Sequence, residues 1–332
     1  MNPNWESFLL SENALFENDV RIVFPSPRNE GGKRIYPVPH LGVLTVAGKD
    51  AAKLLQGQIT CNINDVTETK SSLGALCSPK GRTITTFLLV KKSDDYLLIL
   101  PKELLEPVKK RLQMYVLRAD VTLTDGSDEL CLIGLSYFDT RMNESSSPES
   151  LFATIQQENI SVNLAPDRSR CLIIAEAGNA RKFWSEQVSQ QGFQPEDSEQ
   201  WRYLDIISGI PWLTTETSEE FIPQMLNLDK LGGISFTKGC YTGQEIVART
   251  HYLGKAKRAM FLAECDASVP PEPNSTIIDD SAGTEQDIGK VLSAQSRKNI
   301  CKMLIVLQIS DANIYKLRLK GQNGNEVTLL TV

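Results

Sequence analysis

The chain has 332 residues, of which 41% are hydrophobic and 23% charged, as in an ordinary globular protein. This length exceeds what one small core organises, so we expect two or three domains. The formal net charge of −6 argues against a dedicated nucleic-acid-binding protein, because such proteins are usually basic. No stretch approaches the ~18 consecutive apolar residues of a membrane span, and the start lacks a basic segment followed by an apolar run. We therefore expect a cytoplasmic protein with no membrane partner.

In chain order, the sequence predicts strands and helices that are mixed without a regular alternation. Runs of β-branched and apolar residues predict strands at 42–47, 83–90, 96–100, 121–124, 130–135 and 171–175. Apolar residues at helical spacing predict helices after Asp50 and at 104–116, 180–190 and 199–208. Serine-rich residues 139–150 predict a loop. No Gly-x-Gly-x-x-Gly follows a strand, so the pattern indicates an α+β protein and not a dinucleotide-binding one.

The predicted secondary structure changes in the last part of the chain, where short strands are expected and no helical pattern occurs. The expected strands are residues 260–263, 275–278, 288–293, 302–309 and 315–319, with turns at 279–283 and 321–325. Residues 256–332 therefore predict a separate small β-barrel.

The metal-binding and disulfide-forming residues are few or scattered. The seven cysteines, Cys61, Cys77, Cys131, Cys171, Cys240, Cys265 and Cys301, contain no Cys-x-x-Cys and are odd in number. This pattern argues against a disulfide framework and favours a reducing compartment. The two histidines, His40 and His251, have no partner at ligand spacing. We therefore expect no metal site and no histidine-based catalytic triad.

Residues 238–245, Lys-Gly-Cys-Tyr-Thr-Gly-Gln-Glu, place one thiol in a short polar stretch ahead of a predicted helix. Gly239 and Gly243 flank Cys240, and glycine permits positive φ or a close backbone approach. A cation such as Lys238 and a nearby helix N-terminus favour the thiolate, so we expect a lowered pKa for Cys240. Local spacing alone leaves open whether this is a functional loop or a structural cysteine in a tight turn.

A basic run follows the thiol directly and consists of Arg249, His251, Lys255, Lys257 and Arg258. Such a run either contacts an anion or forms a solvated face of the protein.

A longer segment, residues 221–258, resembles the YgfZ family, folate-binding proteins related to the T-protein of the glycine cleavage system. The resemblance rests on Phe221-Ile222-Pro223-Gln224, Leu231-Gly232-Gly233-Ile234-Ser235-Phe236, residues 238–245 and Val247-Ala248-Arg249. The octapeptide 238–245 is the hallmark of that family. The similarity extends to residues 56–58, 80–81 and Trp201, and so covers nearly the whole chain.

The resemblance implies an α+β, T-protein-like fold. Residues 1–255 would form two interleaved domains, divided near residues 125–140, around a central cavity that binds tetrahydrofolate or a folate derivative. Residues 256–332 would form the β-barrel. It also implies an accessory role in the assembly or repair of iron–sulfur enzymes, including those that methylthiolate tRNA. The partners would be folate and these client enzymes, with tRNA involved only indirectly.

The resemblance also implies the site residues. Cys240 matches the family's functional thiol, and Trp201 matches a folate-contacting tryptophan, although a buried tryptophan is also a common core residue. Leu41 stands where the best-known member has a second folate-contacting tryptophan, which removes one wall for stacking a pterin ring. The basic residues after the thiol, Arg249 among them, are candidates for pairing with the glutamate tail of a folate.

For the thiol itself, the hypothesis is that Cys240 transiently holds a sulfur, iron or cluster species. Lys238 would favour its thiolate, and Gly239 and Gly243 would shape the loop. Tyr241 belongs to the same motif, and Gln244 and Glu245 would fix the loop by hydrogen bonds.

Two alternatives remain at the level of sequence. The first is folate-dependent aminomethyl transfer, which in the T-protein uses an aspartate pair; Thr85 and Thr86 stand at that place here. A threonine hydroxyl neither titrates near neutral pH nor carries the negative charge, so we do not expect a conventional enzyme. The second is a module without chemistry that binds folate and docks onto a client.

Overall fold

A computed structural model describes residues 1–25, 32–138, 151–167, 169–254, 256–281, 285–309, 316–321 and 326–330. The contacts divide the chain into two compact units, each built from segments that are discontinuous in sequence. The first unit contains Met1–Leu54, Ile63–Ser72 and Leu88–Trp201, and the second contains Leu55–Asn62, Leu73–Phe87 and Arg202–Val332. The loop expected at 139–150, and parts of the turns expected at 279–283 and 321–325, lie outside the described residues.

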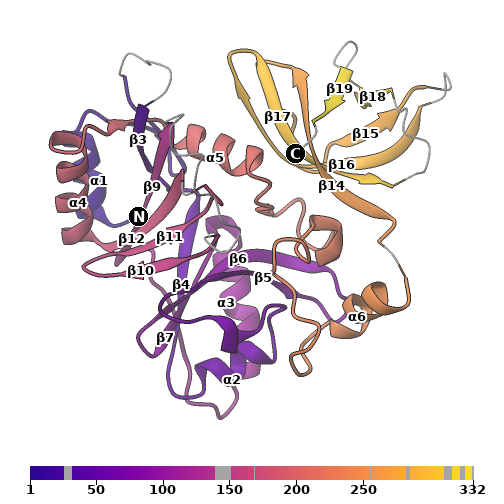
Figure 1. Cartoon of the computed structure of the whole chain (residues 1–332), viewed down its shortest axis with the longest axis horizontal. Coiled ribbons are helices and arrows are strands. Elements are labelled where there is room, and N and C mark those ends of the chain that lie inside the picture. The colour runs from indigo at the N-terminus through magenta and orange to yellow at the C-terminus, as the bar shows by residue number, and fades with distance from the viewer. Residues whose placement is uncertain are drawn as a thin grey trace. The chain divides into compact units, whose positions relative to one another are not determined.

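The first unit contains a six-stranded sheet (Figure 1). In spatial order its strands are β10 (Thr154–Gln156), β11 (Ile160–Asn163), β12 (Arg170–Glu176), β9 (Leu130–Phe138), β3 (Gly32–Pro37) and β13 (Gln194–Pro195). Neighbouring strands are antiparallel except that β13 runs parallel to β3. Two further strands, β1 (Leu15–Asn18) and β2 (Arg21–Val23), form a separate hairpin.

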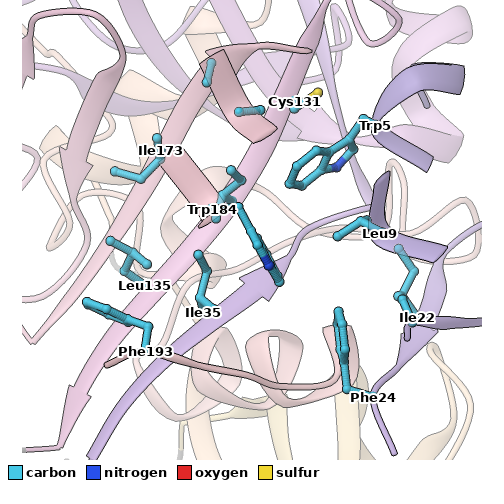
Figure 2. Close-up of a cluster of buried hydrophobic side chains, with 14 residues drawn as sticks. Trp5, Leu9, Ile22, Phe24, Ile35, Cys131, Leu135, Ile173, Trp184 and Phe193 are labelled. Atoms are coloured by element: carbon cyan, nitrogen blue, oxygen red, sulfur yellow. The ribbon is translucent and has the colours of Figure 1, made fainter. Parts of the chain in front are cut away.

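One face of this sheet is buried by the helices α1 (Pro3–Ser11) and α4 (Ala177–Ser189). Trp5 and Leu9 of α1 and Trp184 of α4 pack against sheet residues such as Ile35 and Ile173, as Figure 2 shows. Helix α1 is absent from the helices expected from the sequence. Its start is nevertheless well capped, since the Asn2 side chain accepts hydrogen bonds from the backbone of the first turn.

A second sheet has the order β5 (Ser72–Cys77), β6 (Thr83–Lys92), β7 (Asp95–Pro101), β4 (Leu41–Ala47) and β8 (Thr122–Asp125). The chain passes from the second unit to the first within β6, between Phe87 and Leu88. Helices α2 (Ala51–Gln56) and α3 (Lys102–Val116) and the short 3-10 helix η1 (Ile63–Asp65) complete this part of the chain. The strands and helices expected here are confirmed, with ends shifted by a few residues.

The second unit contains a closed six-stranded barrel, which confirms the expected C-terminal β-barrel. Its strands are β14 (Arg258–Asp266), β15 (Thr276–Asp279), β16 (Gln286–Arg297), β17 (Ile300–Gln308), β18 (Leu317–Leu319) and β19 (Glu326–Leu329). Alternate residues of these strands fill the interior, among them Ala263, Val291 and Ile305. Strand β19 is absent from the strands expected from the sequence.

Between the two sheets and the barrel in sequence lie α5 (Ser198–Ile207), the short 3-10 helix η3 (Pro223–Leu226) and α6 (Gln244–Tyr252). Helices and strands are thus mixed without βαβ repetition, and the α+β class is confirmed. No helix in the described part of the chain combines the length and apolar character needed to cross a bilayer.

Candidate functional site: an exposed thiol on an anchored loop

Cys240 differs from the other cysteines in its exposure. All seven cysteines lie in described residues, and Cys240 is the exposed one; Cys171 is partly exposed and the remaining five are buried. Cys240 belongs to residues 238–243, here called the thiol loop, which immediately precede α6. The loop packs onto residues 56–61, here called the anchoring segment, and both belong to the second unit.

Lys238 fixes the thiol loop to the anchoring segment. Its side chain is 7% exposed, and its amine donates hydrogen bonds of 2.7 Å to the carbonyl oxygens of both Ile59 and Cys61. Burial lowers the pKa of Lys238 to about 8, and the nearby Cys61 acts in the opposite direction. The structure therefore gives Lys238 a different role from the expected one: its amine is bound to two backbone carbonyls instead of to the thiol of Cys240.

Tyr241 is the second anchor. Its side chain is buried, and the amine of Lys238 lies 5.2 Å from the centre of its ring, within the range of a cation–π contact. Burial raises the pKa of the Tyr241 hydroxyl above its ordinary value. Cys240 is thus exposed in the middle of a loop whose neighbours on both sides, Lys238 and Tyr241, point into the protein.

Thr242 joins the thiol loop to the anchoring segment a second time. Its backbone N–H donates to the carbonyl oxygen of Gly57 at 3.2 Å, and its hydroxyl donates to the side-chain oxygen of Gln58 at 3.0 Å. In the sequence, only the resemblance to the YgfZ family singles out residues 56–58. The hydrogen bonds expected from the side chains of Gln244 and Glu245 are not present among the described residues; Gln244 donates through its backbone N–H to Tyr241.

The two glycines of the motif have unequal roles. Gly243 has φ of +83°, and a Cβ built on it would stand 2.5 Å from the carbonyl oxygen of Ser78 and 3.1 Å from the Cα of Gly81. No side chain fits there without a shift of the backbone, so the loop conformation requires glycine at 243. Gly239 has no positive φ, and a Cβ built on it would meet nothing within 4 Å. The structure therefore does not require glycine at 239.

Helix α6 is fixed to the rest of its unit by Gln224, whose side-chain amide donates to the carbonyl oxygen of Val247 at 2.6 Å. The exposed basic residues Arg249 and His251 lie in its last turn, where cations interact favourably with the helix dipole. The His251 ring also stacks on Phe236, with ring centres 3.7 Å apart. Lys255 lies outside the described residues, and contact of this run with an anion stays a prediction.

Trp201, the expected folate-contacting tryptophan, lies in the first unit and is 0% exposed. Its ring packs against Tyr36, with centres 5.4 Å apart, and the guanidinium of Arg170 lies 4.3 Å from its centre. It also packs tightly on β9, because a Cβ built on Gly134 would stand 2.5 Å from its Cζ3 atom. Its indole N–H is buried without a hydrogen-bond partner among the described residues.

Leu41, the other expected folate contact, is 5% exposed at the start of β4. It lines a cavity of about 30 Å³ together with Val38, Lys102 and Cys131. That volume holds a water molecule or two and not a pterin ring. Trp201 is thus packed inside the first unit, and the cavity beside Leu41 is too small for a pterin ring.

Thr85 and Thr86, at the place of the T-protein acid pair, are both 0% exposed. The Thr85 hydroxyl donates to the carbonyl oxygen of Thr86 at 3.0 Å, and the Thr86 hydroxyl donates to that of Pro211 at 2.5 Å. Both hydroxyls are therefore buried and bonded to backbone carbonyl oxygens, away from solvent. In the described residues no group of three or more His, Cys, Asp or Glu side chains is arranged to hold a metal ion.

Curated relatives of the chain are found by sequence similarity. Proteins named tRNA-modifying protein YgfZ are similar to it: that of Colwellia psychrerythraea is 33% identical over 88% of this chain and 90% of the relative. The chain belongs to the YgfZ family. The relative from Hamiltonella defensa is 34% identical over 88% of this YgfZ-family chain and 84% of its own length. That of Escherichia coli O45:K1 is 34% identical over 69% of this chain and 71% of its own.

The fold of this YgfZ-family chain is that of the glycine cleavage T-protein. The solved structure of glycine cleavage system aminomethyltransferase T from Bartonella henselae superimposes with a TM-score of 0.68 over 91% of this chain and 86% of that protein. The two sequences are 12% identical, so this likeness establishes the fold alone. No protein-family model matches the chain.

Proposed function

We propose that this chain is a cytoplasmic accessory protein that supports the assembly or repair of iron–sulfur enzymes, including those that methylthiolate tRNA, and that Cys240 is its functional thiol. The observation that carries the proposal is the exposure of Cys240 on a loop anchored through Lys238, Tyr241 and Thr242. The name of the relatives, tRNA-modifying protein, supports the connection with tRNA modification.

The chemistry of a thiol suits such a role. A thiolate ligates iron and also carries sulfur as a persulfide, and both need solvent access. A single cysteine supplies one ligand, whereas an iron–sulfur cluster usually takes four. A species held by Cys240 would therefore complete its ligand set with groups from the client protein. Binding to Cys240 is then transient, and the species is transferred to the client.

The hydrogen bonds that hold the thiol loop in place also keep the Cys240 thiol exposed to solvent. Two hydrogen bonds from Lys238 and two from Thr242 connect the loop to the anchoring segment on either side of Cys240. Ordering a loop costs conformational entropy. Because the thiol loop is already ordered in the folded protein, binding of a client does not carry that cost.

Aminomethyl transfer is disfavoured. An acid or base at the position of Thr85 and Thr86 would be needed, and both side chains are buried and donate to backbone carbonyls. Folate binding stays a prediction from the family. Trp201 is fully buried and the cavity beside Leu41 is small, so no step of the proposed function is assigned to folate.

The thiol is tested by complementation of a bacterial strain that lacks its own YgfZ-family protein. Methylthiolated nucleosides in its tRNA are quantified by mass spectrometry after expression of wild type, Cys240→Ala or Cys171→Ala. We expect wild type and Cys171→Ala to restore the modification and Cys240→Ala to restore little or none at equal protein level. Full restoration by Cys240→Ala would establish a docking module whose thiol is dispensable.

Folate is tested separately, by calorimetric titration of the purified protein with tetrahydrofolate. The prediction is saturable binding that weakens in Trp201→Phe and persists in Trp184→Phe, since Trp184 is equally buried in the same unit. Absence of binding to wild type would remove folate from the proposal and leave the role of Cys240 untouched.

A further inference from the structure

Two cysteines outside the thiol loop meet inside the barrel. Cys265 of β14 and Cys301 of β17 are directly opposite one another in the antiparallel register, although they are far apart in sequence. Their side chains are 4% and 0% exposed and belong to the barrel core. The Cys301 thiol donates a hydrogen bond of 3.7 Å to the carbonyl oxygen of Lys302.

The backbone at this pair suits a covalent bond between the two sulfurs. Residues directly opposite in an antiparallel pair have Cα atoms about 4.5 or 5.5 Å apart, depending on the hydrogen-bonding position. Disulfides span Cα separations of about 4.4–6.8 Å, so either position is compatible. Because the two residues face each other in register, closure needs no change in the pairing of the strands.

We propose that Cys265 and Cys301 form an oxidisable dithiol that closes to a cross-strand disulfide when the protein meets a peroxide. The proposal concerns a modification site distinct from Cys240 and does not depend on the proposed function. No other register pair in the described strands joins two cysteines: Cys131 faces Ala175, and Cys171 faces Leu135 and Asn163.

The surroundings assign different roles to the two sulfurs. The pKa of Cys301 is lowered chiefly because the Cys265 thiol donates a hydrogen bond to it, with help from the backbone N–H of Gln295. The pKa of Cys265 is raised by the same hydrogen bond and by burial. In the proposed reaction Cys301 is therefore the sulfur that attacks the peroxide, and Cys265 is the sulfur that resolves the product.

The reaction balances in two steps. The Cys301 sulfur attacks one peroxide oxygen, the O–O bond breaks, and Cys301 becomes a sulfenic acid while the other oxygen leaves as water. The Cys265 sulfur then attacks the Cys301 sulfur, the S–O bond breaks, the S–S bond forms and a second water leaves. The two thiols lose two electrons and two protons, and the peroxide is reduced to water.

Access to the pair comes from its position near the end of the strand ladder. The next register pair, Asp266 and Ile300, is the last between β14 and β17, and Ile300 is 44% exposed. The adjoining β16–β17 turn contains Lys298 and Asn299, both with positive φ. Strand ends open locally at a far lower free-energy cost than global unfolding, so a small oxidant reaches the thiols while the barrel persists.

The test uses the full-length protein in the Cys240→Ala background, which removes the exposed thiol. The reduced protein is treated with hydrogen peroxide, its remaining thiols are alkylated in denaturant, and non-reduced peptides are mapped by mass spectrometry. The expected result is one peptide pair linked through Cys265 and Cys301, lighter by two hydrogens and separated by dithiothreitol. Thermal unfolding of the oxidised protein should show an upward shift in Tm that the reductant reverses.

The matched variants are Cys301→Ala, which should show neither the linked peptides nor the Tm shift, and Cys171→Ala, which should show both. The mapping itself needs no variant at these two positions, so a folding defect in Cys301→Ala does not impair it. Recovery of Cys265 and Cys301 as alkylated thiols after treatment would overturn the proposal. A link from either cysteine to Cys61, Cys77, Cys131 or Cys171 would overturn it equally.

Discussion

Gly243 of the thiol loop and Gly81 of the turn before β6 approach so closely that a Cβ built on Gly243 would stand 3.1 Å from the Cα of Gly81. The same Cβ would lie 2.5 Å from the carbonyl oxygen of Ser78, and Gly243 has positive φ. The thiol loop can therefore sit on the turn at residues 78–81 only with glycine at 243. Gly239, on the other side of Cys240, has no such neighbour.

This difference predicts opposite outcomes for two alanine substitutions. Gly243→Ala should lower the free energy of unfolding by about 1–3 kcal/mol, because strained backbone and steric contact add. Gly239→Ala should leave stability within about 0.5 kcal/mol of wild type, as at an open surface position. Urea unfolding measures both. Equal losses from the two substitutions would contradict the assignment of the loop geometry to Gly243.

The buried amine of Lys238 predicts a dependence of stability on pH. Its pKa is about 8 in the folded protein and 10.5 ordinarily, so between these values the unfolded chain holds a proton that the folded protein has lost. The contribution of Lys238 to the free energy of unfolding therefore rises as pH increases from about 8 to about 10.5. The neutral amine retains two N–H donors for the two carbonyl oxygens of Ile59 and Cys61.

The measurement is urea unfolding of wild type and Lys238→Met at intervals across that pH range. The difference in stability between them should widen in favour of wild type as pH rises. Lys230→Met, at an exposed position in the same unit, is the control and should follow the wild-type profile. A constant difference between wild type and Lys238→Met would show that the amine does not titrate in this range.

The hydrogen bond from Thr242 to Gln58 should be visible in a double-mutant cycle. Thr242→Val keeps the shape of the side chain and leaves the largely buried Gln58 oxygen without its donor, at a cost of about 1–3 kcal/mol. Gln58→Leu in addition should recover part of the loss, since both polar partners are then gone. Strictly additive losses would indicate that the two side chains do not interact in solution.

In the first unit, Gly134 provides the space for the Trp201 ring. A Cβ at 134 would stand 2.5 Å from Cζ3 and 2.6 Å from Cδ2 of the ring, so Gly134→Ala should destabilise by about 1–3 kcal/mol and perturb the near-ultraviolet circular dichroism. Gly178→Ala in α4 meets nothing within 4 Å and should be neutral or slightly stabilising. An unaltered spectrum in Gly134→Ala would mean that the ring packs elsewhere.

Local patterns in the sequence were sufficient for the elements and for the choice of thiol. The predicted strands and helices depend on periodicity within short windows, which is why those at 83–90 and 104–116 are confirmed as β6 and α3. The separation of a helix-free barrel from the rest follows from the short strand patterns, the turns between them and the absence of a helical pattern. The octapeptide also marked Cys240 as unusual, because polar residues and glycines around a thiol do not suit a core strand.

The tertiary structure decided which group each of these residues meets. Lys238 adjoins Cys240 in sequence, but its amine binds carbonyl oxygens in the anchoring segment, more than 170 residues earlier in the chain. Trp201 resembled a ligand contact and is fully buried, while Cys265 and Cys301 looked scattered and are register partners. Strand register and burial set these contacts through the packing of distant segments, and no local window of sequence contains that information.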